Sequence, residues 1–269
     1  MAFDWNRDLF VNGAKPKQSL FNVKKLEEGI AKAISDARTS SGHKKKKSFS
    51  PSSFGGVGLC SRYWFFAFHG AEFSESPDPL SVFAMEFGNN YGQSLEERLV
   101  SAGVAAQRQL SISNDDPPIF GYLDFISNIE DEDVVVDLKT VGAEKFESIR
   151  TSMKPPDAHI LQVLLYMKVL KYKAGALVYI NRDTGKMLTV PLCISEKNKK
   201  FIEYVFDWMR ETKRWADEEP EPPARSFPPS NWVCKSCPVK ETCASMENKK
   251  KTGPGKLDID IINWTPPSG

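Results

Sequence analysis

The sequence has no long hydrophobic run. No stretch of its 269 residues reaches the roughly 18 consecutive apolar residues that a membrane-spanning helix needs, so we expect no contact with a membrane. The first residues also lack the basic-then-apolar order of a secretory signal peptide. We therefore expect a cytoplasmic, reducing location, in which the five cysteines indicate metal binding or chemistry rather than disulfides.

The sequence also has little net charge. Its 36 Lys and Arg residues nearly balance its 35 Asp and Glu residues, which leaves a net charge of +1. Affinity for nucleic acid would therefore have to come from local patches rather than from the overall field. The phosphate-binding motif G-x-x-x-x-G-K-[ST] is missing too, so the chain is not itself a motor.

What is present is enough apolar side chain, 41% of the residues, to bury a substantial core. Residues 23–38 have the period of an amphipathic helix. Residues 39–58 are rich in Ser, Gly and Pro and contain the run Lys44–Lys47, which predicts a mobile basic linker or loop. Its lysines are either merely solvated or in weak contact with phosphates. The expected divisions are an N-terminal helix and basic flexible segment at 1–53, a main domain at 54–246 and a tail at 247–269.

Within the main domain, short β-type runs alternate with helical periods. Strands are expected at 107–111, 119–126, 134–140, 176–181 and 187–194, and helices at 82–103, 157–172 and 196–218. Asp157 is the expected N-cap of the middle helix. Three strands, a helix and a further strand in this order predict an α/β fold with a mixed central sheet flanked by helices. Gly88 and Gly92 inside the first helix indicate close backbone packing or a ligand.

Two acids and a lysine fall on neighbouring predicted strands. Side chains alternate along a strand, so Asp137 and Lys139 point to the same face, and Asp124 can lie across from them on the preceding strand. Carboxylates hold Mg²⁺ or Mn²⁺, and a nearby lysine can stabilise negative charge that develops on a phosphate. The alternative is an exposed strand edge with ordinary charges. The apolar run Val134–Val136 favours burial, where a lone carboxylate would need a partner.

The next predicted helix carries a polar stripe. His159, Gln162 and Tyr166 share one side of a helix that is otherwise rich in Leu, Ile, Val and Met. Such a stripe usually faces something polar, which would be the carboxylate–lysine site. Gln162 and Tyr166 reaching water at the edge of the helix is the alternative.

Three of the cysteines lie close together near the end of the chain. Cys234 and Cys237 form a C-x-x-C pair, Cys243 follows, and Cys60 is the candidate fourth ligand of a soft metal or cluster. Cys193 is expected to be an ordinary buried thiol. Four thiolates suit zinc and an iron–sulfur cluster alike, so the cysteine count leaves both open.

Three motifs in this order resemble the RecB-type branch of the PD-(D/E)XK nucleases over about residues 54–243: Gly121-x-x-Asp124, Asp137-x-Lys139 and Gln162-x-x-x-Tyr166. The resemblance implies a restriction-endonuclease-like core. It also implies that Asp124 and Asp137 bind the metal, that Lys139 is catalytic, and that Gln162 and Tyr166 support the site and contact DNA.

The sequence departs from that pattern in one motif. Gly92 stands where the family has a histidine ligand, and Glu96 is the residue that could replace it, directly or through water. A solvated helix face is the alternative for Glu96, because Glu97 and Arg98 follow it.

The cysteine spacing resembles that of the iron–sulfur nucleases of the AddB and CRISPR-adaptation type. This resemblance implies that Cys60, Cys234, Cys237 and Cys243 hold a [4Fe–4S] cluster, which would join the two ends of the domain as a staple, with zinc the less expected occupant.

The same resemblance implies a DNA exonuclease that acts on single-stranded ends, with protein partners in recombination, replication or CRISPR adaptation, and it leaves a phage-encoded origin open. Two alternatives stand beside it, namely a catalytically impaired DNA-binding or scaffold module and a zinc-stapled interaction domain. The candidate DNA contacts are Lys145, Arg150, Lys154, Phe146 and Tyr122.

Overall fold

The computed structural model describes residues 45–74, 79–246 and 252–259, together with scattered positions between 22 and 32. The helix expected at 23–38 and the tail expected at 247–269 lie largely outside these residues. Within the described part of the chain, no helix combines the length and the apolar character needed to cross a bilayer.

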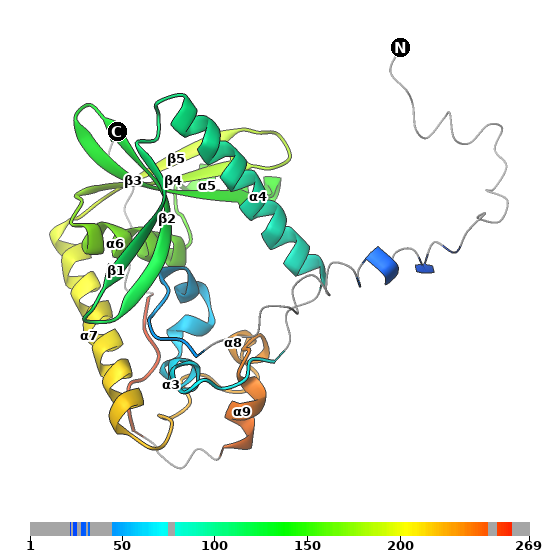
Figure 1. Ribbon diagram of the computed structural model, residues 1–269, viewed down its shortest axis with the longest axis vertical. Helices are drawn as coiled ribbons and strands as arrows, with labels where there is room; N and C mark the ends of the chain where they lie inside the picture. Colours follow the sequence, from blue (N-terminus) through cyan, green and yellow to red (C-terminus); the bar gives the residue numbers. More distant parts are fainter. Residues whose placement is uncertain are drawn as a thin grey trace.

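A five-stranded mixed sheet with helices packed on it forms the upper part of the molecule in Figure 1. Its strands lie side by side in sequence order, with β3 and β4 parallel and the other neighbours antiparallel. The strands are β1 (Gln107–Asn114), β2 (Ile119–Ile129), β3 (Glu132–Val141), β4 (Ala174–Asn181) and β5 (Met187–Cys193). The expected α/β fold with a mixed sheet flanked by helices is therefore confirmed, and each predicted strand exists with ends shifted by a few residues.

Two helices form the connection between the parallel strands β3 and β4. They are α5 (Ala143–Ser152), which the sequence reading missed, and α6 (Asp157–Leu170). Helix α6 lies against one face of the sheet, and Gly175 of β4 allows it to come close, because a Cβ there would lie 2.6 Å from Met167 Sδ and 2.8 Å from Val163 Cγ1. Asp157 begins α6, but the residue at the N-cap position is Pro156, so the expected capping role of Asp157 is wrong.

Helix α4 (Pro79–Ser101) packs against the opposite face of the sheet. Val136 of β3 and Phe125 of β2 form a small apolar cluster there with Leu99 of the helix. Near the other end of the contact, a Cβ at Gly88 would lie 3.1 Å from Thr140 Oγ1. The close backbone packing expected for Gly88 is therefore confirmed.

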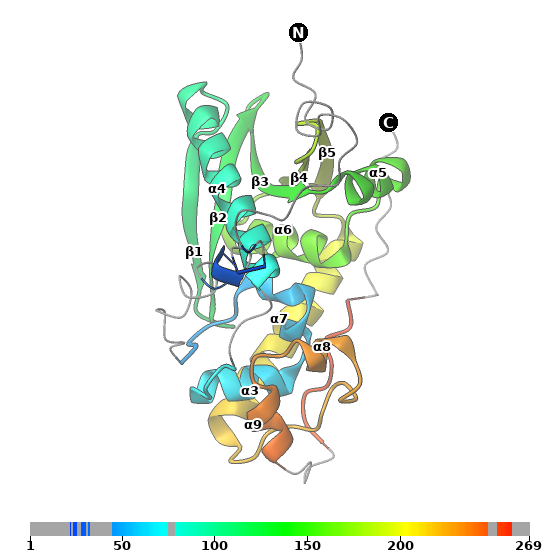
Figure 2. The ribbon, with the colours of Figure 1, turned by 90° about the vertical axis from the view of Figure 1, so that its right-hand side faces the viewer.

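A second, mainly helical part of the molecule lies beyond one end of the sheet (Figure 2). It contains two short 3₁₀ helices, η1 (Pro51–Gly55) and η2 (Val57–Leu59), and three α-helices, α3 (Ser61–His69), α8 (Trp232–Lys235) and α9 (Lys240–Ser245). The long helix α7 (Glu196–Glu218) runs alongside both parts. The sequence shows the residues of α3 as an aromatic stretch with no predicted helix. In the structure all of them except His69 are buried, and Trp64 stacks on Phe68.

Residues 45–50 of the expected linker or loop form an irregular segment and residues 51–58 two short 3₁₀ helices, but the segment is packed into the molecule rather than free of it. Phe49 is completely buried, bridges Ile119 of β2 and packs edge-on against Trp64 with ring centroids 4.7 Å apart. Lys46 donates its backbone N–H to the Ala67 carbonyl, and its ammonium lies 5.5 Å from the centre of the Trp64 ring. The core therefore begins before the boundary at residue 54, because aromatic packing outweighs the loop-like composition of this segment.

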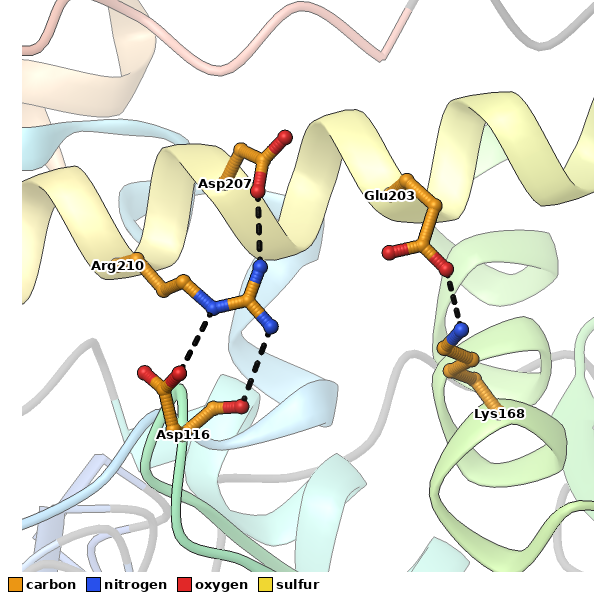
Figure 3. A network of polar contacts seen from close by, with 5 residues as sticks. All are labelled: Asp116, Lys168, Glu203, Asp207 and Arg210. Carbon is orange, nitrogen blue, oxygen red and sulfur yellow. Dashed lines mark hydrogen bonds and ion pairs between the residues drawn. The ribbon is translucent and has the colours of Figure 1, made fainter.

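Polar contacts on the surface of α7 tie it to its neighbours (Figure 3). The Arg210 guanidinium donates to the Asp116 carboxylate at 3.1 Å and to Asp207 at 2.8 Å, and Lys168 of α6 pairs with Glu203. Asp116 lies in the turn between β1 and β2, so this network joins the tip of that hairpin to the helix.

Candidate active site

Asp124 and Asp137 meet where β2 and β3 stop pairing. The ladder between the strands runs from Ile129–Glu132 to Phe125–Val136, and the next step of the same register places Asp124 opposite Asp137. There the ladder is replaced by a side-chain contact, because the backbone N–H of Leu138 donates to Asp124 Oδ2 at 2.6 Å. The sheet thus brings together the two acids that the sequence placed on neighbouring strands.

Lys139 joins this pair of acids. Its Nζ lies 2.7 Å from Asp137 Oδ2 and donates to Gln162 Oε1 of α6 at 3.1 Å. Asp137 is only 1% exposed, and apart from this ion pair its Oδ2 has no hydrogen-bond partner among the described residues. The lysine is therefore held from two sides, and one buried carboxylate oxygen is left with an unused lone pair.

A chain of hydrogen bonds continues from the lysine into the sheet. Gln162 Nε2 donates to Tyr166 Oη at 2.9 Å, and Tyr166 Oη donates to the Tyr122 carbonyl at 2.9 Å. Gln162 and Tyr166 are 8% and 2% exposed, so the alternative in which they reach water is wrong. They link α6, β3 and β2 around the candidate site.

Burial makes the two carboxyl groups hard to ionise. Burial raises the pKa of Asp124 to about 7, with a further contribution from the charge of Asp137. Burial also raises the pKa of Asp137, against the attraction of Lys139. A shared divalent cation would remove this repulsion.

Glu96 approaches the same place from α4. It is 2% exposed, and both of its carboxylate oxygens accept from Gln109 Nε2, at 3.1 and 2.8 Å. The alternative of a solvated helix face is therefore wrong for Glu96. Burial raises its pKa, and its charge contributes to the raised pKa of Asp124. Among the described residues, a Cβ at Gly92 would come near Glu96 Oε1 alone, at 3.9 Å, so this glycine leaves space beside the acid within that part of the chain.

Gln109 is a residue of this site that the sequence reading missed. It lies opposite Asp124 at a break in the β1–β2 ladder and has a left-handed backbone with a φ of 48°. Such a conformation is uncommon for a residue other than glycine, and it accompanies the contact with Glu96. An isolated glutamine in a polar strand gives no signal in the sequence that could have found it.

His159 begins the predicted polar stripe but turns toward β4. Its Nδ1 lies 2.8 Å from Tyr179 Oη, and the two rings stack. Burial lowers the pKa of His159 to about 3, helped by the charges of Lys139 and Lys145. His159 is therefore a neutral neighbour of the lysine rather than a member of the chain through Gln162 and Tyr166.

The acids suit a hard divalent ion with a partly aqueous shell. Among the described residues, no three His, Cys, Asp or Glu side chains are gathered closely enough to form a complete metal site. Mg²⁺ usually keeps several waters and uses only one or two protein carboxylates, and Asp124 and Asp137 can supply these. Asp137 Oδ2 pairs with the Lys139 ammonium and has no further hydrogen-bond partner among the described residues, so it can also face such an ion.

The four cysteines named above lie far from this site in the chain but share one cavity. A cavity of about 360 Å³ is lined by Cys60, Cys234, Cys237 and Cys243. Burial raises the pKa of Cys237 to about 12, and Cys60 and Cys243 raise it further by their charge. The structure therefore groups these four, although no three of them form a compact site for a single ion. Cys193 is exposed at the end of edge strand β5, so its expected burial is wrong.

A buried arginine two residues after Cys60 links the segments of the cysteine region. Arg62 is 1% exposed, and its Nε donates to Cys243 Sγ at 3.2 Å. Its other nitrogens donate to the carbonyls of Pro223 and Met246 at 2.8 and 3.2 Å. One guanidinium thus ties helix α3 to the segment that carries the last cysteine.

The candidate DNA contacts differ in their exposure and in their partners. Phe146 is 1% exposed and lies in the core, so it is not available to stack on a base. Tyr122 is 58% exposed. Arg150 is paired with Glu147 at 2.6 Å, whereas the charge of Lys145 acts on His159 beside the site.

Comparison with known proteins identifies the superfamily to which the chain belongs. The family model of the PD-(D/E)XK nuclease superfamily matches residues 69–244, which include the acids, the lysine and the C-terminal cysteines. The chain belongs to this superfamily. No curated protein sequence matches it.

Solved structures of similar fold are distant in sequence. The crystal structure of SSO0001 is 16% identical and has a TM-score of 0.47, covering 84% of this chain and 98% of that one. An alkaline exonuclease from Laribacter hongkongensis is 12% identical with a TM-score of 0.48, covering 69% and 94%. A phage-related exonuclease from Haemophilus somnus 129PT is 13% identical with a TM-score of 0.34, covering 49% and 73%. Likenesses of this size assign no activity to the chain.

Proposed function

We propose that the protein is a metal-dependent DNA exonuclease that hydrolyses phosphodiester bonds with Mg²⁺ or Mn²⁺. The observation that carries the proposal is the buried Asp137–Lys139 ion pair beside Asp124, in a chain that belongs to a nuclease superfamily. Two neighbouring carboxyl groups whose pKa values are raised by burial, beside a fixed lysine, mark a candidate functional site.

The acids and the lysine have different roles in this proposal: the acids bind a cation, and the lysine stabilises negative charge on the phosphate. Asp124 and Asp137 would hold the cation, with Glu96 acting on it through water. When bound, such an ion polarises a phosphate and lowers the pKa of a coordinated water. Lys139 keeps its ammonium in place through Asp137 and Gln162, where it can stabilise the negative charge that grows on the phosphate.

Hydrolysis at this site would add water to phosphorus and release the 3′ oxygen, which leaves 5′-phosphate and 3′-hydroxyl products. We propose single-stranded ends as the substrate, in recombination, replication or CRISPR adaptation. The RecB-type resemblance of the motifs supports this choice, together with an exposed aromatic side chain, Tyr122, close to the acids.

We also propose that the cysteine cavity holds a [4Fe–4S] cluster. Its four thiols come from the two ends of the domain, and the Arg62 guanidinium donates to one of them, as expected near a thiolate. Zinc and a [4Fe–4S] cluster both accept four thiolates, and the resemblance of the cysteine spacing to that of iron–sulfur nucleases supports the cluster.

A nuclease assay tests the enzymatic proposal. We expect the purified protein to shorten labelled single-stranded DNA with Mg²⁺ or Mn²⁺ and to lose this activity with EDTA. Lys139→Ala should lower the rate by about 10²-fold or more, because it removes a fixed charge from the site. Lys186→Ala, which removes an exposed lysine from the β4–β5 turn, is the matched control and should keep the wild-type rate.

A second function, a scaffold or DNA-binding module that has lost its chemistry, is favoured by Gly92, which gives the site no side chain at that position. The same assay separates the two. DNA binding by a wild-type protein that cleaves neither single- nor double-stranded DNA with any divalent ion would replace the exonuclease by the scaffold.

A further inference from the structure

Two aromatic side chains are exposed on β2 just before Asp124. Phe120 is 44% exposed and Tyr122 is 58% exposed, and their rings pack edge to face with centroids 5.4 Å apart. Between them, a Cβ at Gly121 would face inward, 3.1 Å from Pro51 and 3.8 Å from Tyr166. Because side chains alternate along a strand, Phe120 and Tyr122 project from the opposite, outer side of this part of the sheet.

The neighbouring strand supplies small polar residues on the same side. Ser111 of β1 is the register partner of Tyr122, and Ser113 is the partner of Phe120. Both serines are exposed. The outer side of the β1–β2 hairpin is therefore a sheet surface on which two rings stand among hydroxyl groups, rather than a wide apolar patch of the kind that another protein core would cover.

The strand beneath the rings is firmly held. Phe120 donates its backbone N–H to the carbonyl of buried Phe49 at 2.9 Å. The Tyr122 carbonyl accepts from Tyr166 Oη, which is connected through Gln162 to Lys139. Tyr122 is thus joined by three successive hydrogen bonds to the lysine of the candidate active site, and it is two residues away from Asp124.

We propose that Phe120 and Tyr122 form a stacking surface for the bases of a single-stranded nucleic acid whose phosphate lies at Asp124 and Asp137. Bases of any sequence stack on aromatic rings, whereas the bases of an intact duplex present no open face to them. The proposal rests on the proposed function, since it takes the carboxylate–lysine site as the place where the phosphodiester is cut. It adds the surface that selects a single strand.

Binding can be measured separately from cleavage. The probe is a short single-stranded oligonucleotide that carries 2-aminopurine near one end, titrated with protein in EDTA so that it stays intact. We expect quenching of the 2-aminopurine fluorescence with wild-type protein. Tyr122→Ala and Phe120→Ala should each weaken binding by roughly tenfold, as expected for loss of one base–ring stack. Tyr122→Phe keeps the ring and should keep both affinity and quenching.

Matched controls separate stacking from general apolar contact. Met187→Ala removes a 69% exposed apolar side chain from β5, at the opposite edge of the sheet, and should leave binding unchanged. Tyr122→Leu keeps apolar area without a ring and should lose affinity as the alanine variant does. Thermal melting of each variant shows that the fold is intact.

Three results would overturn the inference: wild-type affinity in both alanine variants, full affinity in Tyr122→Leu, or an equal loss of affinity for a blunt duplex. In each case a wild-type protein that still cleaves DNA with Mg²⁺ would leave the proposed function standing. A wild-type protein that neither binds nor cleaves DNA would instead remove the proposed function, and this inference with it.

Discussion

The carboxylate–lysine site and the cysteine cavity are built in different ways. Asp124, Asp137 and Lys139 come from one hairpin, and backbone pairing of β2 with β3 places them. The cavity depends on contacts between distant segments, such as the bond from Arg62 to Cys243, which are 181 residues apart in sequence. The isolated antiparallel β-bridge between Cys60 and Lys256 is another such contact.

This difference separates two kinds of preorganisation. Sheet hydrogen bonds fix the first site before any ion binds, so its remaining cost is the burial of two acids, with a smaller part from the repulsion of Asp124 by Asp137. The second region closes a very long loop, and a bound group that joins its ends would reduce the entropy of the unfolded chain. Removing the ion from the carboxylate–lysine site should therefore affect activity. Removing the group from the cysteine cavity should affect folding.

The largest expected effect follows loss of a cavity cysteine. Cys237→Ser should abolish bound iron and lower the melting temperature by on the order of 10 °C, since the energy of binding a structural metal group is also folding energy. The measurements are iron content and visible absorbance of anaerobically purified protein, followed by thermal melting.

The control is Cys193→Ser, which changes an exposed thiol outside the cavity and should leave both readings at the wild-type level. Stoichiometric zinc without iron in the wild-type protein would contradict the cluster. Equal melting temperatures of Cys237→Ser and wild type would contradict the stapling role.

A smaller effect with a characteristic pH dependence is expected at Asp124. Its folded carboxyl group keeps its proton up to about pH 7, whereas an unfolded Asp releases it near 3.9. Between these values the folded state binds more protons, so the free energy of unfolding of the metal-free protein falls as the pH rises. Asp124→Asn removes this penalty and should raise the melting temperature in EDTA, more at pH 8 than at pH 5.

The matched change is Asp115→Asn, which neutralises an exposed Asp in the β1–β2 turn and should give no such pH-dependent gain. Adding Mg²⁺ at pH 8 should stabilise the wild type but not Asp124→Asn. A gain in melting temperature that is independent of pH would show that the raised pKa of Asp124 is not its source.

The smallest expected effect lies in the surface network that belongs to neither region. Arg210→Ala removes the contacts with Asp116 and Asp207 shown in Figure 3. Because exposed ion pairs contribute about 1 kcal/mol or less, we expect a modest loss of stability in urea and an unchanged nuclease rate. A large loss of activity would mean that the hairpin tip is coupled to the carboxylate–lysine site.

Local periodicity was sufficient to predict most elements and the grouping of the main site. Alternation along β3 put Asp137 and Lys139 on one face, and helical spacing put Gln162 and Tyr166 where α6 meets the lysine. Their catalytic and metal-binding roles stay predictions. Helix α5 was missed because its residues are mostly charged or polar and only Phe146 and Ile149 are buried.

Features that depend on distant segments were beyond the sequence. The burial of Phe49 requires α3 and β2 to surround it, and the contact of Gln109 with Glu96 requires a break in a strand pair. Cys193 was placed in the core because its strand is apolar, but β5 is an edge strand and the residue falls at its exposed end. These outcomes follow from tertiary neighbours, which a local pattern does not contain.

The absent side chain of Gly175 sets how deep α6 lies on the sheet. An alanine there would press on Met167 and Val163 and push the helix outward. Gln162 and Tyr166 belong to the same turns of α6, so they would move with it and draw the amide away from Lys139 and the phenol away from the Tyr122 carbonyl. Gly175 has no reactive group, yet it sets the distance between α6 and the sheet at the candidate active site. A substitution there can therefore reduce activity although every polar side chain of the site is still present.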